Sequence, residues 1–237
     1  MFYSEELGYL VLTRMEDVSE VFRNPDVYSS ENVQDPVLPI CERAAVVLSA
    51  PDYNPIAILS NRQRPDHTRI RRHTQACFSA RRMRLLEPVI RQRCEAMIET
   101  MLAGGAPADF VAAIGHPLPG ETIFRFIGFP PEDDRKRLAF TWGNASEDEQ
   151  VDIAEKMLAY WRYCVAFVAM RMREPADDFT SELLAIHKRD QAELSYKEIE
   201  SVVYGLSFAG HEIVSNMLSN GLVDLLSNRT QWDELCA

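Results

Sequence analysis

The stretch spanning residues 196–226 constrains the fold more than any other part of this sequence. Apolar residues recur at helical spacing on both sides of the segment SFAGHEIVSNML, residues 207–218, which predicts one continuous, largely buried helix. Ser195, with Glu198 three residues later, forms the capping box that begins such a helix. At 1.5 Å per residue the helix would span roughly 45 Å. We therefore expect it to cross the whole domain as the central element of the fold.

The remaining chain also favours helices, with little sheet. A short strand is predicted in GYLVLTR, residues 8–14, and Thr13 with Glu16 predicts a capping box for the next helix. Prolines punctuate residues 29–66, which predicts a long irregular loop with about one helical turn. Further helices are expected over the following residues: 67–78, 79–104 with a break or restart at Pro88, 120–127, 130–142, 151–173 after an acidic loop, and 179–189. The fold class is therefore mainly α.

Length and composition point to an ordinary globular protein. The chain has 237 residues, 46% of them hydrophobic and 26% charged, and it shows no internal repeat, so we expect a single domain over residues 1–237. It has 25 basic and 36 acidic residues, a formal charge of −11, which disfavours nucleic acid as a partner. No signal-peptide pattern or membrane-spanning apolar run is present, so we expect a cytoplasmic protein with no membrane partner.

No metal site is expected from the cysteines and histidines. The five cysteines stand singly, without a C-x-x-C pair, which favours reduced thiols over disulfides or a zinc cage. The segment HEIVS, which begins at His211, resembles the start of an H-E-x-x-H zinc helix, but Ser215 stands where the second histidine must be. A zinc protease is therefore excluded.

His67 and Arg71 form the first candidate site. They stand four residues apart in RPDHTRIRRHTQACF and so share one face of a helix. A guanidinium beside an imidazole is suited to binding a carboxylate, because Arg can donate two parallel charge-assisted bonds and His a third. The alternative is a solvated charged face in an arginine-rich segment. Spacing alone leaves both interpretations open.

Gly210 and Glu212 form the second candidate site, at the middle of the predicted central helix. Gly210 lacks a Cβ and could let a flat ligand approach the backbone. Glu212 lies on a helix predicted to be largely buried, where a carboxylate is costly unless it is paired or protonated, and such groups often handle protons. The alternative is a paired glutamate and a glycine that permits close helix packing.

Taken together, these two stretches resemble a known family. HTRIRRHTQACFSARRM is similar to the third helix of bacterial cytochromes P-450, with its H-x-x-x-R motif, and FAGHEI is similar to the A-G-x-E-T of their long central helix. TRMEDVSEVFRNPDVYSS and GHPLPGETIFRFIGFPPEDD also match the family's sequence style. The resemblance implies the cytochrome P-450 fold, which is α-rich with minor β structure.

The resemblance also implies a cofactor and residue roles. His67 and Arg71 would hold a propionate of haem, and Ala209 and Gly210 would lie against its distal face. Glu212 would help to route protons to dioxygen. The proline-punctuated loop and the helices on either side of the acidic loop would cover an apolar small-molecule substrate. Electrons would come from a redox partner, a ferredoxin or a fused reductase.

Two departures from the family pattern affect this interpretation. The family's E-x-x-R helix and cysteine ligand loop would lie beyond Ala237, so we expect the N-terminal and central part of a longer enzyme, truncated after the central helix. Cys236 follows QWDEL, not the family's glycine loop, and no proximal iron ligand is expected in this chain. The family's oxygen-activating threonine is replaced by Ile213. Three explanations stay open: the substrate supplies the hydroxyl, a neighbour such as Asn216 or Ser215 holds the water, or the enzyme is poorly coupled. Helix geometry favours Asn216, which lies one turn after both Ile213 and Glu212 and could bridge them.

The sequence therefore predicts a haem-dependent monooxygenase, of which this chain is an incomplete portion and by itself inactive. The alternative is a truncated or degenerate helical scaffold that binds a hydrophobic ligand without turnover, which the missing cysteine loop and Ile213 both favour. A helical regulator that binds nucleic acid through its arginine-rich segment ranks last.

Overall fold

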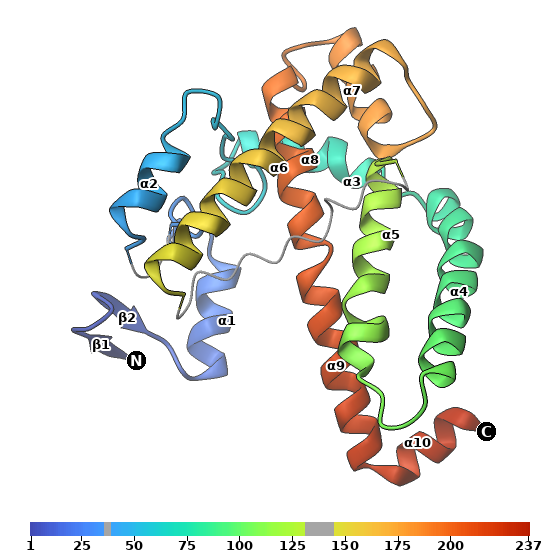
Figure 1. The fold of residues 1–237 in the computed structure, drawn as a ribbon. Coiled ribbons are helices and arrows are strands. Elements are labelled where there is room, and N and C mark those ends of the chain that lie inside the picture. Colours follow the sequence, from blue (N-terminus) through green and yellow to red (C-terminus); the bar gives the residue numbers. More distant parts are fainter. Residues whose placement is uncertain (36–38, 131–144) are drawn as a thin grey trace. The chain divides into compact units, whose positions relative to one another are not determined.

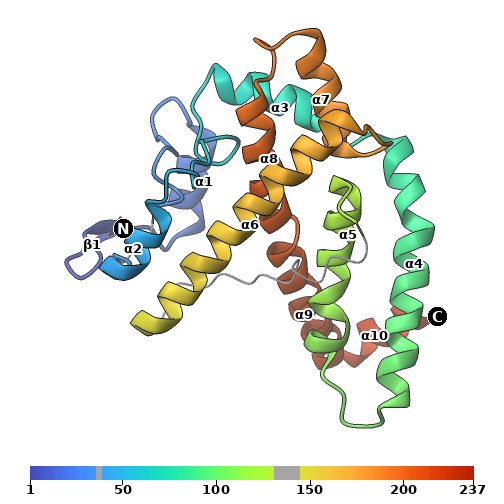
Figure 2. The same cartoon turned by 45° about the horizontal axis from the view of Figure 1, so that its top comes forward.

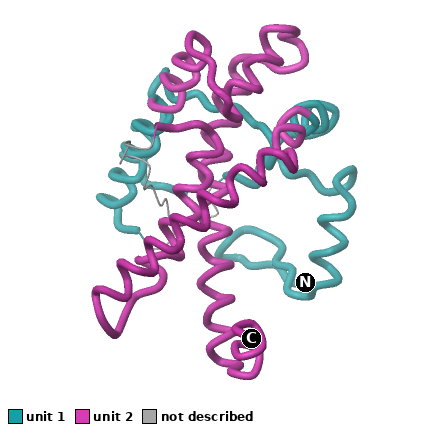
Figure 3. Tube along the Cα trace, turned by 90° about the vertical axis from the view of Figure 1, so that its right-hand side faces the viewer, with its two compact units in different colours: residues 1–72, 140–162 teal, residues 73–139, 163–237 magenta. Residues whose placement is uncertain are grey.

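The computed structural model describes residues 1–35, 39–130 and 145–237. The chain is mainly helical, as the sequence predicts, with one two-stranded sheet near the N-terminus (Figure 1 and Figure 2). It divides into two compact units, each made of two chain segments, which Figure 3 distinguishes by colour. Unit 1 comprises Met1–Arg72 and Phe140–Arg162, and unit 2 comprises His73–Ala139 and Tyr163–Ala237. The expectation of a single domain stays a prediction.

Unit 1 begins with a hairpin of β1 (Phe2–Ser4) and β2 (Tyr9–Val11). The strands pair antiparallel, and Gly8 adopts a φ of +70° in the turn between them. The unit continues with α1 (Met15–Arg23), α2 (Glu42–Leu48), the first part of α3 (Asp66–Ala76) and the first part of α6 (Glu147–Arg173).

The segment around α2 is held against α6 at both of its ends. Before α2, the Cys41 N–H donates to Oε1 of Gln150 over 2.7 Å. After α2, Nε1 of Trp161 donates to the carbonyl of Asp52 over 2.6 Å, and the Asp52 carboxylate pairs with Arg162. Trp161 is only 1% exposed. The described part of the predicted long loop, residues 29–35 and 39–66, therefore contains one short helix, α2, and is held to α6 by these contacts.

Unit 2 holds the rest of α3 and α6 and the remaining helices. These are α4 (Ala80–Ala103), the π-helix η1 (Val111–Gly115), α5 (Pro117–Ile127), α7 (Phe179–Arg189), α8 (Tyr196–Ala209), α9 (Glu212–Ser227) and α10 (Arg229–Cys236). α5 packs against α4, α7, α8 and α9, and α4, α5 and α9 lie side by side in both views (Figure 1 and Figure 2). α5 is therefore the central packing element of this unit.

Several predicted boundaries are confirmed. Ser79 caps α4 by accepting from the Arg82 N–H, and Ser195 and Glu198 form the predicted capping box of α8. Gly128 ends α5 in the left-handed conformation, with a φ of +104°. The structure bears out these signals because each depends on residues close in sequence.

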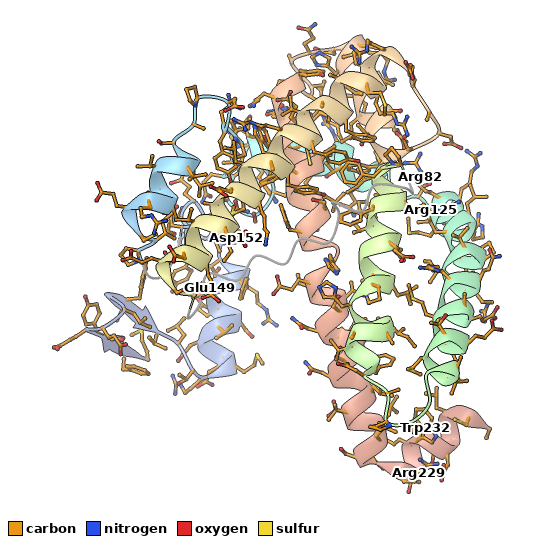
Figure 4. All side chains as sticks on the ribbon, viewed as in Figure 1. Arg82, Arg125, Glu149, Asp152, Arg229 and Trp232 are labelled. Carbon is orange, nitrogen blue, oxygen red and sulfur yellow. The ribbon has the colours of Figure 1, made fainter. Side chains whose placement is uncertain are left out.

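Other boundaries are wrong. Pro88 neither breaks nor restarts α4, which runs through it; Pro88 and Arg84, four residues earlier, are exposed, so the carbonyl that loses its N–H partner can reach water. From Glu147 on, the predicted acidic loop forms the first turn of α6, from which Glu149 projects, with Asp152 in the next turn (Figure 4). α1 begins without a side-chain cap, and its Asp17 pairs with Arg14 instead. The helix expected over residues 130–142 lies, from residue 131 on, outside the described residues.

The prediction of one continuous central helix is also wrong. Residues 196–227 form two helices, α8 and α9, separated by a turn at Gly210 and His211. The interruption falls on the segment that carries the second candidate site, and its geometry therefore decides how that site is presented.

Candidate functional site

The turn between α8 and α9 interrupts the helical hydrogen-bond pattern at one place. The Gly210 N–H still donates to the Leu206 carbonyl over 2.9 Å, but the His211 N–H donates only three residues back, to Phe208, over 3.1 Å. The regular pattern resumes with the Ser215 N–H, which donates to the His211 carbonyl over 3.0 Å. The α-helical hydrogen-bond pattern is therefore broken between Gly210 and Ser215.

Gly210 is explained by packing within unit 2. A Cβ at this position would lie 2.5 Å from Cγ1 of Ile123 on α5, a separation that side chains do not tolerate. The structure thus supports close helix packing, which the sequence left open as the alternative reason for this glycine. Contact between the Gly210 backbone and a ligand stays a prediction.

The predicted catalytic residues share an exposed face of the turn and of α9. Ala209, Glu212, Ile213 and Asn216 are all exposed, and Ile213 has 70% of its surface accessible. The prediction of a buried Glu212 is wrong because α9 packs through its other face, where Ser215 is buried and Ser219 approaches Gly115 of η1. This uncovered face, which carries the acid Glu212 and the large apolar side chain of Ile213, can contact a flat apolar group.

His67 and Arg71 belong to unit 1 and lie one turn apart on α3. His67 is half-buried and Arg71 is exposed. Burial lowers the pKa of His67 below its ordinary value, and the charges of Arg71 and Arg64 lower it further. The two side chains are therefore close enough to interact, as their spacing predicts. This pair lies in unit 1, whereas the α8–α9 turn lies in unit 2.

His211, which the sequence offered only as the start of a rejected zinc motif, is a structural residue of the turn. Its side chain is 6% exposed, and Nε2 donates to the His116 carbonyl over 2.9 Å. The two imidazole rings meet edge to face, 4.3 Å apart. Burial lowers the pKa of His211, which keeps the ring neutral at pH 7. Only tertiary packing reveals this role, since the two histidines are 95 residues apart in the sequence.

The cysteines differ in accessibility. Cys77 and Cys164 are buried, Cys41 and Cys94 are partly buried, and Cys236 is exposed at the end of α10. Burial, with the nearby Glu182 carboxylate, raises the pKa of Cys77 to about 12. Cys77 is therefore a thiol, and not a thiolate, at neutral pH.

Two further findings concern metals and membranes. Within residues 1–35, 39–130 and 145–237, no group of three or more His, Cys, Asp or Glu side chains is placed to hold a metal ion. In the same part of the chain, every helix is too short or too polar to cross a bilayer.

Comparisons with known proteins give consistent likenesses. No family model matches the chain. It is 32% identical over 236 residues to a steroid C26-monooxygenase of Mycolicibacterium smegmatis, which covers 95% of this chain and 52% of that protein. Among solved structures, cytochrome P-450 CREJ in complex with (4-ethylphenyl) dihydrogen phosphate gives a TM-score of 0.90 at 33% identity, over 99% of this chain and 60% of that one. An intact type IV self-sufficient cytochrome P-450 monooxygenase gives 0.91 at 26% identity, over 99% and 32%. The chain spans about half the length of the curated relatives it matches.

Proposed function

The chain belongs to the cytochrome P-450 family, and from this premise we propose that it supplies the N-terminal and central part of a haem-dependent monooxygenase. The fold and family predicted from the sequence are thereby confirmed. The observation that carries the proposal is the exposed face of the α8–α9 turn, where Ala209, Glu212 and Ile213 stand uncovered beside Gly210.

His67 and Arg71 fit the haem propionate that we assign to them. Their donors project from one face of α3, and the pKa of His67 is lowered first by burial and then by the positive charges of Arg71 and Arg64. A carboxylate at this place would relieve that repulsion and accept bonds from both side chains. Each charge-assisted bond would contribute about 1.5–3 kcal/mol to cofactor retention.

The α8–α9 face fits the distal side of a flat macrocycle. Ala209 presents only a methyl group there, which lets a planar ligand approach the end of α8. Glu212 is exposed and can exchange protons with solvent, so we assign it the transfer of protons toward the reacting centre. Haem would supply the oxidising chemistry, which its thiolate ligand promotes.

Ile213 is the residue that most limits this proposal. It has no hydroxyl, so it cannot position a proton donor where most of the family has threonine. Asn216, one turn later on α9, is exposed as well, and its amide can both donate and accept. We propose that Asn216 takes over part of this role by holding a water near Glu212.

The substrate and the electron donor are proposed only as classes. An apolar small molecule is consistent with relatives named steroid C26-monooxygenase and vitamin D(3) 25-hydroxylase. A ferredoxin or a fused reductase would supply electrons, and one structural neighbour is described as self-sufficient. A cytoplasmic location, with neither nucleic acid nor membrane as a partner, stays a prediction from the sequence.

A second candidate function is a scaffold that binds a hydrophobic ligand without turnover. Ile213 favours it, because this side chain has no hydroxyl to donate. Within this chain, Cys77 is held as a buried thiol and Cys236 lies on an exposed helix end. We propose that none of the chain's own cysteines is the proximal ligand. Haem binding without product formation by the native-length protein would support this second function.

Haem retention tests the main proposal. In the native-length protein, Arg71→Ala should lower haem occupancy after gel filtration, and His67→Ala should lower it less. Arg72→Ala is the matched control, because this neighbouring arginine is also exposed but points about 100° away around the same helix. Equal occupancy in all three variants would refute the propionate assignment.

A further inference from the structure

The turn between α8 and α9 packs against three residues of α5 and its N-cap. His116, Gly120 and Ile123 are spaced four and three residues apart and therefore form one stripe. His116 accepts the hydrogen bond of His211, and a Cβ at Gly120 would lie 3.2 Å from the same imidazole nitrogen. Ile123 fills the space beside Gly210. The turn therefore contacts α5 and its N-cap at three positions along one face.

The hydrogen bond from His211 is the polar contact between the turn and the N-cap of α5. A neutral imidazole has one N–H, and because Nε2 faces a carbonyl oxygen, we assign that proton to Nε2. The bond is partly buried, with His211 itself 6% exposed, so its loss would leave the His116 carbonyl without this donor in a place only partly open to solvent. The neighbouring groups that can carry charge are His116 itself and Glu212.

We infer that His211 is a positioning residue whose hydrogen bond to the His116 carbonyl fixes the α8–α9 turn and thereby sets the direction in which Glu212 and Ile213 project. The side chain of His211 points into unit 2, whereas the next two side chains are exposed. A rotation of the turn about the helix axis would carry both exposed residues away from their present direction. The catalytic meaning of this role rests on the proposed function.

Two substitutions at His211 distinguish the contribution of its hydrogen bond from that of side-chain packing. His211→Gln keeps an N–H donor at a similar reach, whereas His211→Leu keeps an apolar side chain and removes the donor. Leu184→Ala is the control for general destabilisation, because Leu184 is buried on α7 and is separate from the turn.

Amide hydrogen exchange of residues 210–215, relative to residues 200–204 of α8, measures the turn directly and needs no haem. We expect His211→Leu to raise this ratio about tenfold, the effect of losing one partly buried hydrogen bond, and His211→Gln to stay near the wild-type ratio. Leu184→Ala should leave the ratio unchanged. A wild-type ratio in His211→Leu, or an equal rise in His211→Gln, would overturn the inference.

The second readout is product formed per electron consumed by the native-length, haem-loaded protein. We expect His211→Leu to lower it at unchanged haem content and His211→Gln to restore it. If exchange rises in His211→Leu but product per electron does not fall, the positioning role is refuted and the turn is only structural. If the wild-type protein binds no haem, the proposed function fails, and the exchange ratio still decides whether His211 fixes the turn.

Discussion

Replacing Gly128 by alanine tests the junction at which α5, α6 and α7 meet. Gly128 ends α5 with a φ of +104°, and a Cβ there would collide with the carboxylate of Asp178. That carboxylate is 7% exposed, pairs with Nε of Arg171 over 2.6 Å and caps α7 by accepting from the Ser181 N–H over 2.8 Å. Arg171 also donates to the Gly128 carbonyl over 2.7 Å. The substitution therefore disturbs all three helix ends at once.

Two costs add in this variant. A non-glycine residue in the left-handed region costs about 1–2 kcal/mol, and displacing one partner of a buried ion pair costs about 3–5 kcal/mol. We therefore expect Gly128→Ala to lower the free energy of unfolding by at least about 4 kcal/mol. Urea unfolding measures this as a lower midpoint at an unchanged slope.

Gly105 supplies the matched control. It lies in the same unit with a φ of +80°, and no atom lies within 4 Å of the Cβ that alanine would add. Gly105→Ala should therefore cost only about 1–2 kcal/mol of backbone strain. In an Asp178→Ser background, which keeps a capping oxygen and removes the carboxylate, Gly128→Ala should cost no more than the control. Equal costs for both glycines in the unmodified background would refute the collision.

Further predictions concern single groups. Ile213→Thr in the native-length protein should keep haem bound and raise product formed per electron, whereas Glu212→Gln should lower turnover on the order of 100-fold by removing the titrating group; no change in either quantity contradicts the assigned roles. Because the folded-state pKa of His211 is lowered, the unfolded state binds that proton first, so its contribution to stability should be present above about pH 6.5 and lost as pH falls. Unfolding free energy measured against pH checks this, and His211→Gln should flatten the acid side. A thiol reagent at pH 8 should modify Cys236 rapidly and Cys77 only on unfolding, and equal rates would contradict the burial.

Local signals predicted much of the fold. The capping box at Ser195 and Glu198 and the glycine end of α5 each depend on neighbours in sequence, and both are confirmed. The start of α6 carried a readable signal that the sequence analysis did not use: the Ser146 N–H donates to the Glu149 carboxylate over 2.7 Å, as in a capping box. The hairpin partner β1 was missed, because its three residues give too short a pattern.

The interruption of the central helix could not be predicted in the same way. The segment around Gly210 keeps helical spacing on both sides, and one glycine is tolerated within a helix. What separates α8 from α9 is tertiary, since Ile123 occupies the space beside Gly210 and His116 holds His211. The exposure of Glu212 follows from the same cause, because the packing of the turn against α5 determines which face of α9 is exposed.

The absorption spectrum of the reduced, carbon monoxide-treated native-length protein tests the central claim most directly. It reports bound haem and its axial ligand together. We predict the strongly red-shifted band of a thiolate-ligated haem, weakened by Arg71→Ala in proportion to lost haem and unaffected by Cys77→Ser or Cys236→Ser. Absence of haem, or a thiolate band that either cysteine substitution abolishes, would contradict the account.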